Sequence, residues 1–251
     1  MIYNLVVDIG NTHSRIVGFD SKQAILARKK TFSNEQEIYN QVSRMSQGGC
    51  NLILSSVIPL SDSFIDKLKN KTKHCVFLDK TTKLPFINKY ETPDTLGSDR
   101  LAALSGASHL YVGEDVLVVD AGTCITIDLL SKEGIYFGGA IIPGLNMQYK
   151  AMHEFTGKLP DILHNVDDPD YNEVFNQQLG WSTNKSMKMG VGFMQCRALD
   201  SIIDSYRVEM PEMVMLFTGG DAKFFERRLK NKIFANPDLT LIGLNLILDC
   251  N

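Results

Sequence analysis

The sequence predicts an α/β protein built from two related domains. An apolar strand ending in Asp, a Gly-containing turn with Thr and a second strand occur in residues 4–20 and again in 116–130. Between the repeats, apolar runs of strand length alternate with segments of helical periodicity, which is typical of sheets covered by helices. Because the repeats start about half a chain length apart, we expect an N-terminal domain over 1–113 and a C-terminal domain over 114–251.

The first domain is expected to open with strands and to continue with alternating helices and strands. A tight turn is predicted at Asp20-Ser21-Lys22, and Ser33-Asn34 followed by Glu37 is typical of a helix start. Ser98 is placed to cap the last helix. The expected elements are strands in 4–31, a helix at 35–46, a strand at 51–57, a helix at 61–70, a strand at 74–79, a linker at 80–96 and a helix at 101–110.

The second domain repeats the strand–turn–strand pattern. Prolines and neighbouring aspartates in 157–182 predict an extended loop, and apolar residues every three or four positions in 184–206 predict a long helix. The expected elements are strands at 116–130 and 136–145, a helix at 145–155, the loop, the long helix, and a strand within 214–222 that runs into a Gly-Gly turn and a further helix.

Composition excludes several classes of protein. The net charge is −3 with no basic block, so we expect no nucleic-acid partner. No apolar run approaches the roughly 20 residues that span a bilayer, and the N-terminal residues are typical of a first strand, not of a signal peptide. The five cysteines are scattered and form no CxxC pair, which favours free thiols in the cytoplasm over zinc or disulfides.

The turn after the first strand, Asp8–Thr12, is a candidate phosphate loop. Its glycine lets backbone N–H groups approach phosphate oxygens, and Asn11 and Thr12 add side-chain donors. Asp8 is suited to Mg²⁺, which prefers oxygen ligands. An ordinary β-hairpin turn is the alternative, since Asn and Gly are common there. The similar segment Asp120–Thr123 favours the phosphate loop.

Gly97–Arg100 places a carboxylate and a guanidinium at the start of a helix. Asp99 is suited to orient or deprotonate a hydroxyl, and Arg100 to hold an anionic or carbonyl group. The alternative is a helix cap with a local Asp–Arg pair, and the residues alone favour it.

Three further segments have open interpretations. The adjacent glycines of Thr218–Ala222 permit close approach of a flat ligand such as adenine, or simply form a tight turn. Thr183 is a natural N-cap, a role that does not exclude contact with a substrate. The methionines at 187–194 are suited to core packing or to a subunit interface.

Taken together, the segments DIGNT, GSDR, DAGT and TGGDA and the restart at mid-chain resemble those of type III pantothenate kinases. This family belongs to the acetate and sugar kinase, Hsp70 and actin superfamily. The resemblance covers essentially the whole chain, with the motifs in family order. The Asp-Gly-Thr loops mark only the superfamily, whereas GSDR before the second loop marks this family. The implied fold is two ribonuclease H-like domains with the nucleotide in the cleft between them.

The resemblance also implies an activity, which is ATP-dependent phosphorylation of pantothenate in the first step of coenzyme A synthesis. Mg²⁺ and a potassium or ammonium ion would assist, in a cytoplasmic homodimer. Asp99 would accept the proton of the substrate hydroxyl, Asp120 would bind the monovalent cation, and Asp8 would hold Mg²⁺ through water. ATP would be bound by Asp8, Ile9, Gly10, Asn11, Thr12, His13, Ser14, Arg15 and Thr123. Pantothenate would be held by Tyr90, Gly97, Ser98, Asp99 and Arg100, and by Thr183 of the neighbouring subunit.

The chain departs from the family pattern at three positions. Arg15 stands where Lys is usual, and it keeps the charge but not the compact geometry of Lys. Ser98 and Cys124 each stand where Ala is usual, and both are small substitutions.

Two other functions are compatible with this superfamily. One is a non-catalytic, nucleotide-binding regulatory protein, and the other is a kinase for a different small hydroxyl or carboxyl substrate. The presence of Asp8, Asp99 and Asp120 together favours an enzyme over a scaffold.

Overall fold

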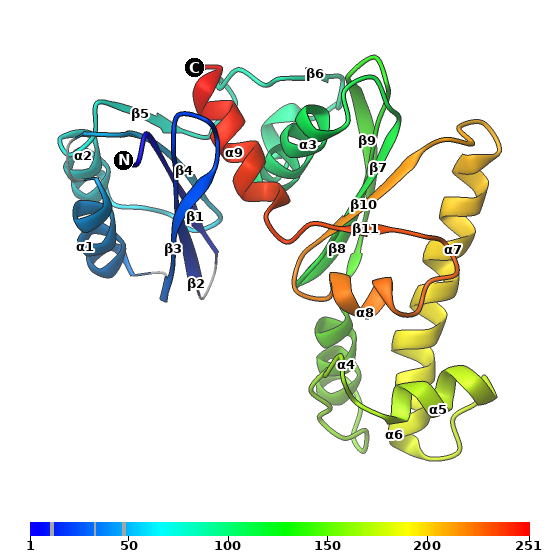
Figure 1. The fold of residues 1–251 in the computed structure, drawn as a ribbon. Coiled ribbons are helices and arrows are strands. Elements are labelled where there is room, and N and C mark those ends of the chain that lie inside the picture. Colours follow the sequence, from blue (N-terminus) through cyan, green and yellow to red (C-terminus); the bar gives the residue numbers. More distant parts are fainter. Residues whose placement is uncertain (11–12, 33, 47–48) are drawn as a thin grey trace. The chain divides into compact units, whose positions relative to one another are not determined.

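The computed structural model describes residues 1–10, 13–32, 34–46 and 49–251. They form two compact units, whose elements are labelled in Figure 1. The first unit holds Met1–Val112, Gly134–Phe137 and Asp238–Asn251, and the second holds Gly113–Glu133 and Gly138–Pro237. Whereas the sequence assigns everything after residue 113 to one domain, the structure groups a short segment and the C-terminal helix with the first unit.

The first unit contains a five-stranded sheet in the order β3-β2-β1-β4-β5. Its strands are β1 (Asn4–Ile9), β2 (His13–Phe19), β3 (Ile25–Phe32), β4 (Asn51–Ser56) and β5 (His74–Phe77). β1, β2 and β3 pair antiparallel, while β4 pairs parallel with both β1 and β5. The predicted turn before β3 is confirmed: Asp20 Oδ1 accepts the N–H groups of Lys22 and Ala24.

Helices cover both faces of this sheet. α1 (Glu35–Met45), which begins at the predicted Asn34 cap, and α2 (Asp62–Lys69) pack on one face. α3 (Ser98–Leu110) and α9 (Leu239–Asp249) lie side by side in Figure 1, and their apolar residues share a core with β1 and β4. Because α9 buries residues on every side, its burial against this sheet explains why the end of the chain belongs to the first unit.

The start of β9 belongs to the first unit, but the sheet of the second unit repeats the same strand order, β9-β8-β7-β10-β11, with a sixth strand added next to β9. Its strands are β7 (Val116–Ala121), β8 (Cys124–Leu130), β9 (Ile135–Pro143), β10 (Val214–Thr218) and β11 (Phe234–Ala235). As in the first unit, the central strand β7 pairs antiparallel with the strand that follows it and parallel with its other neighbour, β10. The predicted duplication of one α/β domain is confirmed by this shared topology.

The predicted linker over 80–96 contains two short elements of the first unit. β6 (Ile87–Asn88) pairs with Ile135 and Tyr136 at the start of β9. A 3₁₀ turn at Pro93–Thr95 then leads into α3.

Helices of the second unit bury the apolar face of its sheet. They are α4 (Leu145–Glu154), α5 (Asp170–Gln177), α6 (Thr183–Lys188), α7 (Met194–Arg207) and α8 (Ala222–Glu226). A π-helical segment, Met189–Phe193, joins α6 to α7. Two expectations are wrong here. α5 lies within the predicted loop, because Tyr171 and Val174 give it a buried face, and the N-cap of α6 is Ser182, not Thr183.

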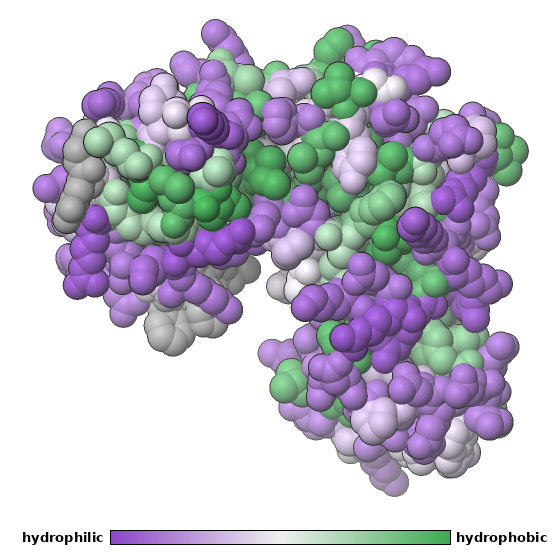
Figure 2. Space-filling model, viewed as in Figure 1, coloured by the Kyte–Doolittle hydropathy of each residue, from purple (hydrophilic) through white to green (hydrophobic). Residues whose placement is uncertain are grey.

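Surface and cysteine chemistry agree with the composition. Figure 2 shows polar side chains over most of the face drawn, with apolar ones scattered among them. All five cysteines are free. Among the described residues, no helix is long and apolar enough to cross a membrane.

Candidate active site

The first predicted phosphate loop lies where β1 ends and β2 begins. Asp8 and Arg15 are partners in the strand register, and Arg15 donates to Asp8 Oδ2 from Nε at 3.1 Å and from Nη2 at 2.6 Å. Nη2 also donates to Thr240 Oγ1 in α9, at 2.7 Å. Arg15 therefore links this loop to the helix that returns from the C-terminus. Of the other predicted ATP contacts, Asn11, Thr12 and the side chain of His13 lie outside the described residues.

Three positions of this loop are described around the pair. Ile9 is a buried end of β1, Gly10 follows it, and Ser14 is buried at the start of β2. Since both Ile9 and Ser14 point into the first unit, their backbone groups, not their side chains, are the parts suited to meet a ligand.

The GSDR segment lies beside Asp8 at the same edge of the sheet. Ser55, the register partner of Asp8 on β4, donates from Oγ to Ser98 Oγ at 3.1 Å. The expectation that Ser98 caps α3 is wrong, because Gly97 is the N-cap and Ser98 is the first helical residue. A Cβ on Gly97 would overlap Asp99 Oδ1, so glycine leaves room for that carboxylate.

Asp99 and Arg100 have different surroundings, although they are adjacent. Asp99 is exposed, and its Oδ1 accepts the backbone N–H of Arg100 at 2.8 Å. Arg100 is only 4% exposed and donates from Nη2 to Tyr136 Oη at 2.7 Å. Arg100 is thus directed toward aromatic side chains, whereas Asp99 faces solvent.

Arg100 lies over two stacked tyrosines. Its guanidinium carbon is 5.5 Å from the ring centroid of Tyr90 and 5.9 Å from that of Tyr136, whose rings stack with centroids 5.9 Å apart. These distances are typical of cation–π contacts. The predicted substrate residues Tyr90, Ser98, Asp99 and Arg100 are therefore close together in one unit. Tyr136 was missed, because a tyrosine within a strand gives no sign of such a role.

The second predicted phosphate loop occupies the equivalent position in the second unit. Asp120 is the next-to-last residue of β7 and lies beside Thr218 of β10, and Gly122 and Thr123 form the turn into β8. Gly219 follows Thr218 with φ +90°, and a Cβ there would overlap Ala121 O. Only glycine fits this close approach, which brings the TGGDA segment against the DAGT segment.

These two segments share a pocket of about 480 Å³, within the range of small-molecule sites. Its lining residues are Gly122, Thr123, Asn146, Met147, Lys150, Gly220 and Asp221. Burial raises the pKa of Asp221 to about 6. The sequence pointed to Thr123 and to the Gly-Gly turn, but not to the α4 residues, which reach the pocket only through the fold.

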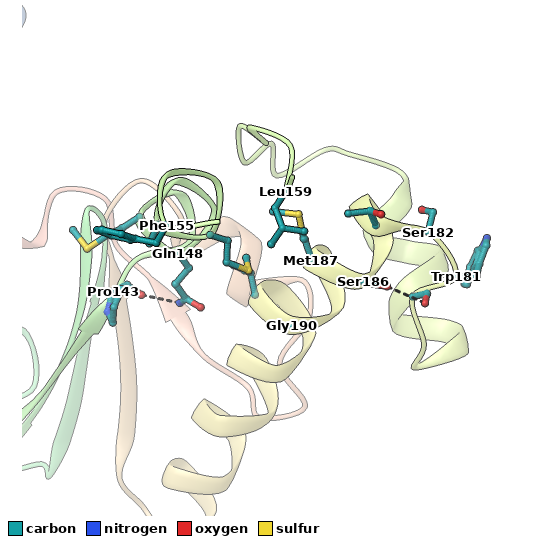
Figure 3. A pocket seen from close by; sticks show the side chains of 15 residues that line it. Pro143, Gln148, Phe155, Leu159, Trp181, Ser182, Ser186, Met187 and Gly190 are labelled. Atoms are coloured by element: carbon teal, nitrogen blue, oxygen red, sulfur yellow. Dashed lines mark hydrogen bonds between the residues drawn. The ribbon is translucent and has the colours of Figure 1, made fainter. Parts of the chain in front are cut away.

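Thr183 lies at a second, larger pocket of the same unit. This pocket has a volume of about 1190 Å³ and is lined mainly by apolar side chains of α4, α6 and the loop before α6. Figure 3 shows Phe155, Leu159 and Met187 around it, with Trp181 and Ser182 at one end. The pocket is mainly apolar, and Thr183 is the one residue lining it that the sequence singled out for substrate binding.

Two sheets of one topology, each with Asp next to last in its central strand and a glycine in the turn that follows, define the two-domain α/β fold that actin-like ATPases and sugar kinases share. A ROK family glucokinase from Streptomyces griseus, solved with glucose and AMPPNP, has this fold, with a TM-score of 0.53 at 12% identity and 99% of each chain covered. The chain itself belongs to the type III pantothenate kinase family, whose model matches residues 4–205.

Individual relatives agree with this assignment. A type III pantothenate kinase from Christiangramia forsetii is 36% identical over 252 residues, which cover 99% of this chain and 98% of the relative. A solved Campylobacter jejuni protein, described as a proposed Baf family transcriptional activator, aligns with a TM-score of 0.60 at 23% identity and 98% coverage of both chains. At that identity the second likeness shows the fold alone.

Proposed function

We propose that the chain transfers the γ-phosphoryl group of ATP to the primary hydroxyl of pantothenate. The observation that carries this proposal is the full-length match to type III pantothenate kinases together with the GSDR segment beside Asp8. The reaction is the first committed step of coenzyme A synthesis, and we place it in the cytoplasm, where ATP is available.

Asp99 is proposed as the proton acceptor toward the pantothenate hydroxyl. It is exposed at the start of α3, and Oδ1 is held by the N–H of Arg100, which fixes the direction of the carboxylate. The helix N-terminus stabilises the ionised form and weakens it as a base. That cost is small for phosphoryl transfer, since alignment of the hydroxyl dominates in a loose transition state.

Tyr90, Gly97, Ser98 and Arg100 are proposed to hold pantothenate. The cation–π contact with Tyr90 and the hydrogen bond to Tyr136 hold the Arg100 guanidinium in a fixed position next to Asp99. The half-buried Tyr90 ring leaves part of its surface accessible to the substrate.

The two loops are proposed to divide the work on ATP. In the first, Asp8 fits Mg²⁺, which proteins commonly bind with one or two carboxylates plus water and phosphate oxygens. When bound, Mg²⁺ neutralises phosphate charge. Arg15 has to share the Asp8 carboxylate or turn to phosphate, and its contact with Thr240 gives it a second anchor.

In the second loop, Thr123 is proposed to contact phosphate and Asp120 to hold a potassium or ammonium ion. Thr123 is exposed on the 480 Å³ pocket, where its hydroxyl and the glycine backbone are available as donors. Asp120 fits an alkali cation, because its carboxylate oxygens and the nearby carbonyl of Ala121 are the hard oxygen donors that such ions take.

A homodimer is proposed to place Thr183 at the pantothenate site of the neighbouring subunit. The support is the large apolar pocket at α4 and α6, in whose lining Trp181 and Phe155 are exposed. Exposed apolar area of this kind is typical of subunit interfaces. Sedimentation of the purified protein tests this part separately from activity.

A substrate panel tests the proposal. Purified protein is given ATP, Mg²⁺ and potassium with pantothenate, acetate or a hexose, and ADP formation is followed. We expect turnover with pantothenate and none with the others. Turnover with acetate or a hexose would reassign the substrate, and turnover with none of them would favour the regulatory alternative.

A further inference from the structure

A chain of buried polar groups lies behind the pocket that Thr123 and Asp221 line. Tyr149 Oη and Tyr171 Oη are 2.7 Å apart, and Tyr171 Oη is 2.9 Å from His164 Nδ1. Both tyrosines are fully buried, and the His164 side chain is 2% exposed. The rings of Tyr171 and Phe224 pack edge-on against the imidazole, with centroids 5.6 and 4.9 Å away, and hold it in place.

The other imidazole nitrogen faces the pocket. His164 Nε2 is buried and has no hydrogen-bond partner among the described residues, and Asp221 Oδ1 lies 3.6 Å from it. That separation is just beyond hydrogen-bond length, so a movement of a few tenths of an ångström by Asp221 would close it. The Asp221 side chain is itself only 16% exposed and lines the pocket.

Hydrogen-bond direction decides which nitrogen carries the proton. Burial and the nearby Arg228 lower the pKa of His164 to about 4, so the imidazole is neutral at pH 7 and has one N–H. If Tyr149 donates to Tyr171 and Tyr171 donates to Nδ1, the proton is on Nε2 and is directed at Asp221. Both tyrosines can donate, because burial also raises their pKa values.

The charged neighbours of the pair leave this arrangement intact. Arg228 and Asp168 face His164, and Asp168 is itself paired with Lys188 at 2.6 Å. On the pocket side, Lys150 pairs with Glu154 of its own helix at 3.5 Å. Among the described residues, no Lys or Arg side chain forms an ion pair with the Asp221 carboxylate that would compete with Nε2–H.

We propose that His164 is a positioning residue that holds the Asp221 carboxylate for the ribose hydroxyls of ATP. The inference rests on the proposed function. Within the pocket, Thr123 and Lys150 are suited to phosphate, whereas a carboxylate repels phosphate and accepts from hydroxyl donors. The 2′ and 3′ hydroxyls are adjacent, so both can donate hydrogen bonds to one carboxylate. They can donate to its two oxygens, or both to the outer oxygen while His164 holds the other.

The test compares ATP with 2′,3′-dideoxy-ATP in direct binding measurements without pantothenate. We expect Asp221→Asn to weaken ATP binding about tenfold, the loss typical of a hydrogen bond to a charged group, and to leave dideoxy-ATP binding unchanged. His164→Leu should show the same pattern with a smaller loss, about threefold to fivefold. His164→Gln, which keeps an N–H donor, should restore most of the affinity.

Two further variants separate positioning from folding. Tyr171→Phe keeps the ring but removes the donor to Nδ1, so it should weaken ATP binding in the same direction even if His164→Leu does not fold. His109→Gln, at an exposed histidine of α3, is the matched control and should bind both nucleotides as the wild type does.

The outcomes distinguish this inference from the proposed function. If the wild type phosphorylates pantothenate, a raised KM for ATP at near-normal kcat in Tyr171→Phe supports the positioning role of His164. Equal losses for ATP and dideoxy-ATP, or unchanged binding in both His164→Leu and Tyr171→Phe, would overturn it. If the wild type binds ATP but phosphorylates no pantothenate, the proposed function fails and the ribose comparison still stands by itself.

Discussion

Asp99 has two possible roles that its sequence pattern does not separate: a carboxylate that stabilises a helix start, and a proton acceptor. Asp99 is exposed, and its Oδ1 accepts a backbone N–H. Asn has nearly the same shape as Asp, so an Asn at this position would keep that contact but lose the charge. We expect Asp99→Asn to lower kcat by about 10²–10⁴-fold, the usual contribution of a proton acceptor, with ATP affinity changed less than threefold.

Steady-state kinetics and ATP binding on the same preparation measure both effects. Asp94→Asn, at an exposed carboxylate of the neighbouring 3₁₀ turn, is the control and should keep full activity. Near-normal kcat in the Asp99 variant would remove this residue from the mechanism.

His164 also makes stability depend on pH. Because its pKa is about 4 when folded and about 6.5 when unfolded, the unfolded chain binds the proton more tightly. The stability it contributes is therefore present above pH 6.5 and is lost as the pH falls toward 4. Between pH 7 and 5 the loss is about 2 kcal/mol.

Urea unfolding of the wild type and of His164→Gln at pH 7 and pH 5 measures this term. When the pH falls from 7 to 5, the wild type should lose about 2 kcal/mol more unfolding free energy than the variant, because only the wild type has His164. Asp221 titrates in the same range with the opposite sign, since its folded pKa is raised, but it is present in both proteins. An unchanged difference would mean that His164 is not held neutral.

Among single residues, the sequence predicts candidates for chemistry but not the side chains that they contact. Asp8, Asp99 and Thr123 stay predictions, made from local motifs near strand ends or at a helix start. The contacts of Arg100 with Tyr136 and of His164 with Asp221 join residues far apart in the chain, and no local spacing encodes them.

Among the elements, those with a short apolar run or a clear helical period were predicted, whereas two helices were not. β1, β7 and the helices α1 and α2 follow the expected ranges within a few residues. α5 was missed because prolines and aspartates around it are typical of a loop. α9, with the sequence LTLIGLNLILD, was not predicted, since it is apolar on every side and periodicity cannot separate such a run from a strand.

The crossing of α3 and α9 depends on two glycines. A Cβ on Gly243 would overlap Ala102 O of α3, and one on Gly106 would overlap Leu239 O of α9. We expect Gly243→Ala to lower the free energy of unfolding by about 1–3 kcal/mol, because the helices have to move apart.

Thermal or urea unfolding measures the loss. Gly157→Ala is the control, since a Cβ there meets no atom within 4 Å. If Gly243→Ala unfolds as the wild type does, the two helices do not pack as closely as the structure has them.

For the whole molecule, the sequence predicts the duplication of one domain, but it does not predict that the last helix, α9, belongs to the first unit. Leu244 of α9 is fully buried in a core shared with Val6 and Ile53 of the first sheet. We expect Leu244→Ala to cost about 3 kcal/mol, by loss of buried area and by cavity formation. Hydrogen exchange should accelerate at β1 and β4 and change little at β7 and β10.

A control and an exchange pattern test whether α9 belongs to the first unit. Leu246→Ala, at a half-buried position of the same helix, is the control and should have a smaller effect. Faster exchange confined to β7 and β10 would contradict the grouping of α9 with the first unit.

We expect the chain to phosphorylate pantothenate at its primary hydroxyl. Phosphorus NMR and mass spectrometry of the product, formed with ATP, Mg²⁺ and potassium, test it most directly. We predict one phosphate ester, 4′-phosphopantothenate, in equal amount to ADP. ADP without an ester, or phosphate on the secondary hydroxyl or the carboxylate, would contradict the claim.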